Sequence, residues 1–226
     1  MGRCRPCDKF PWKNPNFIGV IIALILVYLL FNYEFLFREN NVGVIFYIIL
    51  FLFLMAMWSY FAAAFTNPGP VPVFWGIYSE HQSGERKYCL VCHNFKPERA
   101  HHCSRCKQCI LNMDHHCPWI NNCVGFDNRK FFMLFLTYLV LALYVAFVIM
   151  IIVMIKDCKL LFSGKPISVF DFVIKVLLFL AFFGLILTLT FFTITHYKFV
   201  ATNTTTLEDL VANKKKKEDS YRISNS

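Results

Sequence analysis

The stretch that decides the fold reads CLVCHNFKPERAHHCSRCKQCILNMDHHCPWINNCVGFDN and spans residues 89–128. It holds seven of the ten cysteines in the 226-residue chain, with histidines between them. Two cysteine pairs, Cys89 with Cys92 and Cys103 with Cys106, have the C-x2-C spacing that grips one side of a tetrahedral zinc ion. The segment has few large apolar residues, so zinc would supply its folding free energy.

The number of possible ligands leaves two arrangements open. Two closed tetrahedral sites need eight ligands, which seven cysteines and one histidine provide, as do six cysteines and two histidines. The second arrangement leaves one thiol free, and Cys117 in the sequence Asp114-His115-His116-Cys117 is the obvious candidate. His115 could then take the proton of the thiol, with Asp114 orienting the imidazole. The alternative is that Cys117 is an ordinary zinc ligand that Asp114 supports.

Long apolar segments flank the cysteine-rich stretch on both sides. The chain is 57% hydrophobic and 16% charged, whereas about a quarter of a typical soluble domain is charged. A bilayer core takes roughly 20 helical residues, and residues 17–37, 42–65, 131–155 and 175–195 all qualify. The sequence therefore predicts an all-α membrane protein with four transmembrane helices. The cysteine-rich domain lies between the second and the third.

Basic residues predict the orientation, because cytosolic segments carry an excess of Lys and Arg. Of 23 such residues, 18 lie before the first span, between the second and third spans, or after the fourth. We therefore expect both termini and the zinc domain to face the cytosol. The predicted organisation is an N-terminus with helices 1 and 2 (1–65), a zinc domain (66–130), helices 3 and 4 (131–197), and a cytosolic tail (198–226).

Residues 89–128 resemble the cysteine-rich domain of the DHHC protein S-acyltransferases, or palmitoyltransferases. The shared pattern is C-x2-C-x3-K-P-x-R-A-H-H-C-x2-C-x2-C-x4-D-H-H-C-P-W-x-N-N-C-V-G-x2-N. Four spans around this domain are the layout of that family. Residues 203–208 resemble its N-x-T-T-x-E motif, and residues 66–69 resemble its D-P-G motif with Asn67 in place of Asp.

The resemblance implies a role for each of these residues. One zinc ion would be bound by Cys89, Cys92, His102 and Cys109, and the other by Cys103, Cys106, His116 and Cys123. Cys117 would be the nucleophile, with His115 as its base and Asp114 as the orienting acid. The supporting residues would be Thr205, Thr206, Glu208 and Asn203. Among these, Thr206 would contact Asp114, and Asn203 or Glu208 would anchor the tail to the zinc domain.

The implied activity is protein S-acylation in two ping-pong steps. Cys117 would accept the chain of a long fatty acyl-CoA, with palmitoyl-CoA as the expected donor, and pass it to cysteines of membrane-associated proteins. The acyl chain would lie in a cavity of the four-helix bundle, where the small Ala142 could leave room for a longer chain. Candidate CoA phosphate partners are Arg129, Lys130 and Lys198, with ordinary juxtamembrane charge as the alternative. The expected location is the Golgi, the endoplasmic reticulum or the plasma membrane.

Two other interpretations remain at this stage. The chain could be a membrane-anchored zinc scaffold such as a RING-like ubiquitin ligase, although a RING needs no Asp-His-His-Cys turn. It could also be an inactive member of the family that binds acyl-CoA without transferring the chain. A nucleic-acid partner is not expected, because no C-x2-4-C-x12-H-x3-5-H finger is present. The sequence shows no evident repeat, and His196 is interpreted as interfacial at the end of the fourth helix.

Overall fold

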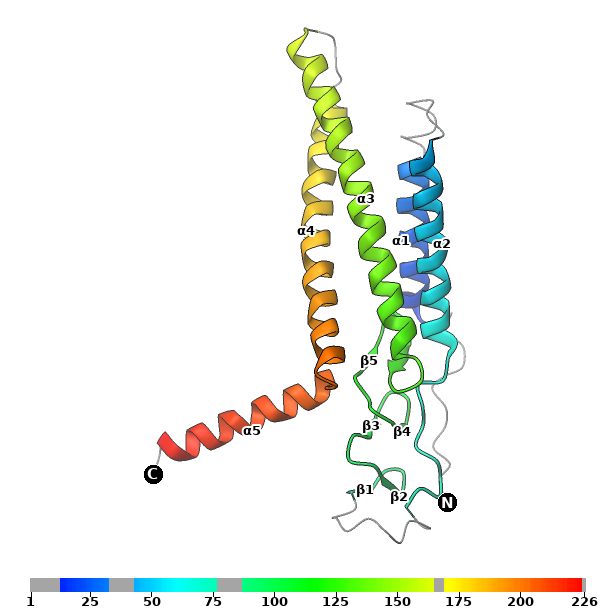
Figure 1. The fold of residues 1–226 in the computed structure, drawn as a ribbon, viewed down its shortest axis with the longest axis vertical. Helices are drawn as coiled ribbons and strands as arrows, with labels where there is room; N and C mark the ends of the chain where they lie inside the picture. The colour runs from blue at the N-terminus through cyan, green and yellow to red at the C-terminus, as the bar shows by residue number, and fades with distance from the viewer. Residues whose placement is uncertain (1–12, 33–42, 77–86, 165–168, 225–226) are drawn as a thin grey trace. The chain divides into compact units, whose positions relative to one another are not determined.

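The computed structural model describes residues 13–32, 43–76, 87–164 and 169–224. The helices in these residues are α1 (Pro15–Asn32), α2 (Val44–Phe65), α3 (Arg129–Phe162), α4 (Val169–Ala201) and α5 (Thr206–Ser224) (Figure 1). Between α2 and α3 the chain forms short strands, which are β1 (Lys87–Cys89), β2 (Asn94–Lys96), β3 (His101–Cys103), β4 (Gln108–Ile110), β5 (His115–Cys117) and β6 (Asn122–Val124).

Among the described residues, three helices are long and apolar enough to cross a membrane. The candidate spans are Val44–Phe65, Arg129–Phe162 and Phe172–Ala201. The apolar part of α1, Pro15–Leu29, is shorter, and residues 33–37 of the first predicted span lie outside the described residues, as does Val42. The structure therefore supports a mostly helical membrane protein.

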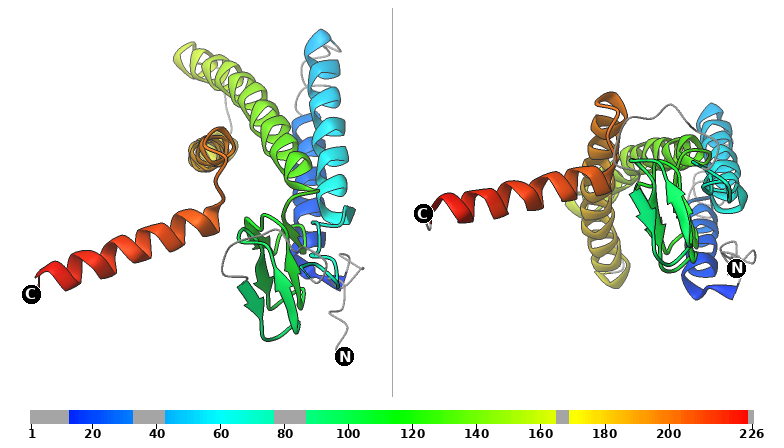
Figure 2. Two further views of the ribbon diagram at one scale, coloured as in Figure 1. Left: turned by 60° about the horizontal axis from the view of Figure 1, so that its bottom comes forward. Right: turned by 90° about the horizontal axis from the view of Figure 1, so that it is seen from below.

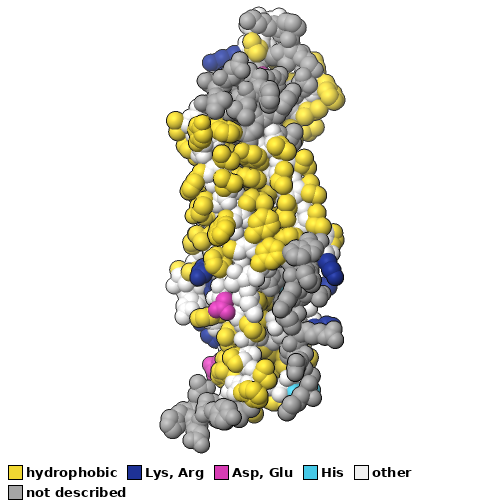
Figure 3. Space-filling view, turned by 90° about the vertical axis from the view of Figure 1, so that its right-hand side faces the viewer, with side chains coloured by type: hydrophobic (Ala, Val, Ile, Leu, Met, Phe, Trp, Pro, Cys, Tyr) yellow, Lys and Arg dark blue, Asp and Glu magenta, His cyan; other side chains and the backbone are white. Residues whose placement is uncertain are grey.

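The surface of these helices suits lipid rather than water. The α2 side chains of Tyr47, Phe51, Leu54 and Trp58 are each more than half exposed. Figure 3 shows hydrophobic side chains gathered along the helices on the face in view. A helix that is apolar all round and is not covered by protein is typical of a membrane span.

The chain divides into two compact units. We call one the hairpin unit, which comprises Met1–Ala23, Ser59–Met133 and His196–Ser226. The other is the helix unit, which comprises Leu24–Trp58 and Leu134–Thr195. All described residues of the zinc domain and of the N-x-T-T-x-E segment belong to the hairpin unit.

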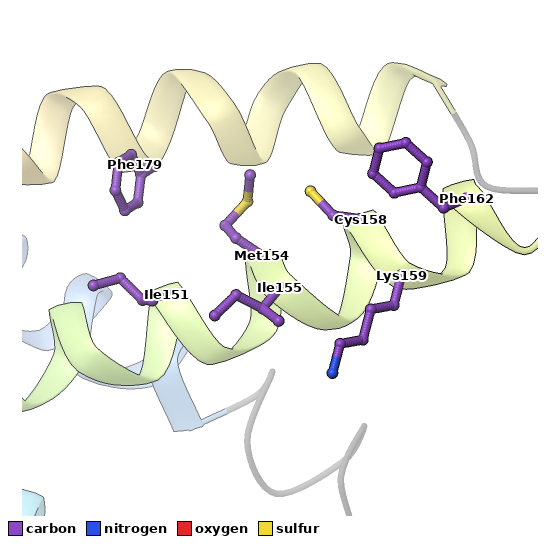
Figure 4. A pocket seen from close by; sticks show the side chains of 7 residues that line it. All are labelled: Ile151, Met154, Ile155, Cys158, Lys159, Phe162 and Phe179. Carbon is purple, nitrogen blue, oxygen red and sulfur yellow. The ribbon is translucent and has the colours of Figure 1, made fainter.

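In the helix unit, α3 and α4 pack side by side in opposite directions (Figure 1). Phe147 of α3 stacks on Phe179 of α4, with ring centroids 5.0 Å apart. Further along, Lys175 of α4 pairs with Asp157 of α3. The two helices also line an apolar cavity of about 330 Å³ (Figure 4), bordered by Ile151, Met154, Ile155, Cys158, Lys159, Phe162 and Phe179.

The strands form three antiparallel hairpins, β1–β2, β3–β4 and β5–β6, which lie one beside the next (Figure 2). They repeat every 14 residues, since their first strands end at Cys89, Cys103 and Cys117. The residue four positions later has a positive φ in each hairpin: 50° at His93, 52° at Lys107 and 49° at Asn121. The hairpin turn is therefore built in the same way three times.

Two sequence expectations are wrong for this segment: the absence of a repeat and the all-α fold. Helices and strands are recognised from the spacing of apolar residues over many positions. Each of these strands has only three residues, too few for such a pattern to appear. The 14-residue repeat is present in the positions of the cysteines and histidines, but that spacing was interpreted only as a pattern of metal ligands.

The third hairpin is attached to the end of α2 by side-chain hydrogen bonds. The last carbonyls of a helix have no partner within it. The amide nitrogen of Asn122 donates to the carbonyl oxygens of Ala63, Ala64 and Thr66, at 3.3, 3.1 and 2.9 Å. Asn128 also donates to the Ala63 oxygen, at 3.0 Å. These bonds attach hairpin β5–β6, which contains Cys117, to the end of α2.

A fully buried tyrosine adds a second link within the same unit. The hydroxyl of Tyr60 on α2 donates to the carbonyl oxygen of Trp119, at 2.8 Å. Trp119 lies two residues after Cys117, in the turn between β5 and β6. The backbone at Gly125 also packs closely against Pro68. A Cβ atom at position 125 would lie only 2.4 Å from the Pro68 carbonyl oxygen, so a larger residue would not fit there. The backbone around Cys117 is therefore held from several sides.

Candidate active site and metal sites

Two groups of cysteines and histidines lie between consecutive hairpins. In each group the candidate ligand atoms all lie within 4.8 Å of one another, so each could hold a metal ion. The first group joins hairpins β1–β2 and β3–β4, and the second joins β3–β4 and β5–β6. The groups consist of Cys89, Cys92, His102 and Cys109, and of Cys103, Cys106, His116 and Cys123.

The distances within both groups fit zinc. The Nδ1 atom of His102 lies 3.2–3.9 Å from the three sulfur atoms of its group, and Nδ1 of His116 lies 3.4–3.7 Å from those of the second group. Ligands around a tetrahedral zinc ion, with Zn–S near 2.3 Å and Zn–N near 2.0 Å, are separated by about 3.5–3.8 Å. Three thiolates and one imidazole are also a common donor set for structural zinc.

Cys117 belongs to neither group, although it has the same place in its hairpin as Cys89 and Cys103. Three residues after each of those cysteines comes a second cysteine, but three residues after Cys117 comes Ile120. In addition, β6 is followed by α3, so no further hairpin supplies a histidine and a cysteine across from Cys117. The thiol is buried, with 5% of the residue exposed.

Asp114 is fully buried and accepts several hydrogen bonds. Its Oδ1 atom accepts the backbone N–H of Thr206 at 2.7 Å, and Oδ2 accepts the Thr206 hydroxyl at 3.0 Å. His115 donates from Nδ1 to Oδ2 at 2.8 Å. Burial by itself would raise the pKa of Asp114, but the bonds from His115 and Thr206 outweigh it and lower the pKa to about 2. The carboxyl group is therefore ionised at neutral pH.

The N-x-T-T-x-E segment forms a helix cap, which explains its spacing. The hydroxyl of Thr205 accepts the N–H of Glu208 at 3.2 Å, while the Glu208 carboxylate accepts the N–H of Thr205 at 2.8 Å. This reciprocal pair is a capping box at the start of α5. Thr206 is the first residue of that helix, so its N–H points away from the helix and towards Asp114. The positive end of the α5 dipole thus stabilises the Asp114 carboxylate.

His115 is oriented by the same carboxylate. Because Nδ1 donates to Asp114, Nε2 is the ring atom left for Cys117. Burial opposes charge on the imidazole, but hydrogen bonds with Asp114 and with Cys117 outweigh this and raise the pKa of His115 to about 9. The thiolate is the nucleophilic form of cysteine, and an imidazole next to a thiol can exchange a proton with it.

Arg99 joins the zinc domain to the segment after α4, and its role was missed in the sequence. It donates to both carboxylate oxygens of Glu208, at 2.6 and 3.1 Å, and to the side-chain and backbone oxygens of Asn203 at 3.2 and 2.8 Å. Either Asn203 or Glu208 was expected to anchor the tail, and the structure shows both bound to Arg99. The signal in the sequence was an arginine within the K-P-x-R-A-H-H-C pattern that no metal site needed.

Replacing Arg99 with Lys is expected to lower the free energy of unfolding by about 1 kcal/mol, because an ammonium group cannot make the two parallel bonds of a guanidinium fork. Thermal unfolding of the purified protein measures the effect. Arg105→Lys is the matched control, since Arg105 is exposed. Equal melting temperatures for the two variants would contradict this role of Arg99.

His196 lies in a place that the sequence did not suggest. The residue is only 3% exposed, and its Nδ1 atom is 3.6 Å from Oδ2 of Asp114. The side chains of Asp114, His115 and His196 are close enough to suggest a further metal group. Thr206 and His115 already donate short hydrogen bonds to the Asp114 oxygens, which accounts for the contact between Asp114 and His115 without a metal ion.

The three residues considered for CoA binding differ in their surroundings. Arg129 donates from Nη2 to the carbonyl oxygen of Thr204, at 2.9 Å, so it also helps to hold the segment before α5. Lys130 is exposed, and its ammonium group lies 4.9 Å from the centre of the Phe131 ring. Lys198 is exposed near the end of α4. The two lysines are therefore more accessible to a ligand than Arg129.

Membrane-length helices and a domain with two Cys/His groups define a class of integral membrane proteins with a cysteine-rich domain. A family model described as DHHC palmitoyltransferase matches residues 82–213, which is more than half of the chain. The chain therefore belongs to the DHHC palmitoyltransferase family.

Individual relatives agree with this family. Probable protein S-acyltransferase 12 of Arabidopsis thaliana is 36% identical over 181 residues, which cover 74% of this chain and 61% of the relative. Probable protein S-acyltransferase 14 of the same plant is 37% identical over 188 residues, covering 71% and 60%. Palmitoyltransferase ZDHHC2 of Homo sapiens is 63% identical over 62 residues, covering 27% and 17%. The chain thus spans about three fifths of the length of these plant relatives.

Proposed function

We propose that this protein is a protein S-acyltransferase whose nucleophile is Cys117. One observation carries the proposal: Cys117 lies outside both Cys/His groups, and His115, two residues before it, donates a hydrogen bond to the buried Asp114. A structural zinc ligand would not need this pair. A free thiol that attacks a thioester does, because only the thiolate is an effective nucleophile.

The first step loads the acyl chain onto the enzyme. The Cys117 thiolate attacks the carbonyl carbon of a long-chain acyl-CoA, and the bond from that carbon to the CoA sulfur breaks. CoA then leaves as a thiol with the proton held by His115. Asp114 keeps Nδ1 of His115 engaged throughout, so that Nε2 faces the reacting sulfur atoms.

The second step transfers the chain to a protein. A cysteine of a membrane-associated substrate gives its proton to His115 and attacks the acyl group on Cys117. The new thioester forms as the bond to Cys117 breaks, which restores the Cys117 thiolate and the protonated His115. The same histidine thus serves as acid in one step and base in the next.

The two Cys/His groups would hold structural zinc ions, with the ligand sets inferred from the sequence. Each ion would join neighbouring hairpins and supply folding free energy to a segment with a small apolar core. The second ion would hold His116, the residue next to His115, and so keep the Asp-His-His-Cys turn rigid.

The membrane environment completes the proposal. Four spans would place the zinc domain at the cytosolic face, where acyl-CoA is available. Each buried methylene of the chain contributes about 0.8 kcal/mol, so an apolar helical bundle can bind it tightly. Lys130 and Lys198, with Arg129 in a secondary role, are candidate partners for the CoA phosphates. An endomembrane or the plasma membrane would be the site of action.

Incubation of the purified protein with labelled palmitoyl-CoA tests the proposal. We expect an adduct that hydroxylamine removes, that maps to Cys117, and that is absent from Cys117→Ser. Cys158→Ser is the matched control, since Cys158 belongs to the helix unit and not to the hairpin unit, and it should acquire the adduct as the wild type does. Adduct on Cys117→Ser would exclude this cysteine, and a wild type without adduct would favour a zinc scaffold.

A further inference from the structure

His196 stands beside the proposed catalytic pair but has no part in the chemistry described so far. It lies near the end of α4, ten residues before Thr206. Its ring centroid is 5.7 Å from that of His115 and 5.6 Å from that of Phe132. Phe132 in turn contacts His115 edge-on, at 5.4 Å. The imidazole of His115 therefore belongs to a cluster of three rings that come from β5, α3 and α4.

The position of His196 relative to Asp114 suggests a polar role as well as packing. The Oδ2 atom of Asp114 already accepts bonds from His115 and Thr206 at 2.8 and 3.0 Å. Nδ1 of His196 faces the same oxygen at 3.6 Å, a separation that is too long for a hydrogen bond. Hydrogen bonds in active sites are often long without substrate and shorten when the reacting complex forms.

Asp114 depends on these neighbours because it is fully buried. A buried carboxylate that loses a donor can rotate, and His115 would then turn away from Cys117. Thr206 holds Asp114 from the start of α5, while His196 approaches it from α4. The two residues thus reach the same carboxylate from different helices, and only His196 can also pack its ring against His115.

We propose that His196 is a positioning residue for Asp114 and His115. Its Nδ1–H donates to Oδ2 of Asp114 in the complex with acyl-CoA, and its ring keeps His115 aligned on Cys117. This inference rests on the proposed S-acyltransferase function. It predicts that His196 affects the rate of acyl transfer to Cys117 and leaves the binding of acyl-CoA unchanged.

The test compares His196→Leu and His196→Asn in the full-length protein, with labelled palmitoyl-CoA over a range of concentrations. His196→Leu should lower the maximal rate of Cys117 acylation about 10-fold or more at an unchanged half-saturating concentration. The amide nitrogen of His196→Asn can replace Nδ1, so this variant should stay within about threefold of the wild type. Tyr197→Phe, one residue further along α4, should match the wild type.

Zinc content and melting temperature are measured on the same samples, and they should equal those of the wild type. Three results would overturn the inference: an unchanged rate in His196→Leu, equal slowing of both variants, or slowing that follows a loss of zinc or of thermal stability. A wild type that forms no adduct on Cys117 would overturn the proposed function itself. Failure of the two proposals is therefore distinguishable.

Discussion

Asp114→Asn is expected to slow acylation of Cys117 by about 10³-fold or more, since a comparable change in a catalytic triad costs about 10⁴-fold. The carboxylate accepts donors on both oxygens, from the N–H and hydroxyl of Thr206 and from His115. An asparagine has one accepting oxygen, so its NH2 group would face at least one of these donors. The resulting repulsion favours the wrong tautomer or orientation of His115.

The rate is measured in a single turnover with saturating labelled palmitoyl-CoA, and zinc content is measured in parallel. Asp127→Asn is the matched control, because Asp127 is exposed and lies in the same domain. It should react at the wild-type rate. A rate for Asp114→Asn within tenfold of the wild type would show that Asp114 does not orient the base.

The other large effect is expected from Cys103→Ser, which removes one ligand from the group between the second and third hairpins. Structural zinc contributes about 10–16 kcal/mol to the folding of small zinc domains, and the third hairpin carries Asp114 and Cys117. We therefore expect the variant to lose at least one zinc ion per chain together with all acylation. Metal analysis and protease sensitivity of the zinc domain measure the result.

Cys117→Ser provides the comparison, because it occupies the same hairpin position without belonging to either group. It should keep the zinc content and protease resistance of the wild type while losing the adduct. If Cys103→Ser kept all its zinc, the ligand assignment would be wrong. If Cys117→Ser lost zinc, Cys117 would be a ligand rather than a free nucleophile.

Much of the site was accessible from the sequence, because its parts are close together in the chain. The eight residues of the two Cys/His groups are those that the family resemblance implied, whereas the number of possible ligands alone left two arrangements open. Asp114, His115 and Cys117 lie within four residues, so their proximity follows from covalent connection alone. The contact between Thr206 and Asp114 was likewise expected from the motif.

The hairpins and the distant contacts were not accessible in this way. Three-residue strands give no periodic signal in apolar residues, and the 14-residue spacing of Cys89, Cys103 and Cys117 was interpreted only as ligand spacing, so the repeat of hairpins was missed. Arg99 meets Glu208 across 109 positions of the chain, and nothing in either local sequence specifies the pairing. His196 carried no motif at all, and an isolated histidine at the end of an apolar helix gives no indication of its partner.

The sequence by itself indicated the class of protein and the Cys/His clusters, because residue type, spacing and hydropathy are local properties, and the family resemblance chose among the possible ligand sets. Only the tertiary structure showed which distant residues contact the Asp-His-His-Cys turn. The start of α5 brings Thr206 to the buried Asp114, and the end of α4 brings His196 beside His115. Asn122 and Asn128 attach the third hairpin to α2. These contacts join segments far apart in the chain, and those of the buried Asp114 and Asn122 satisfy polar groups that would be costly to bury alone.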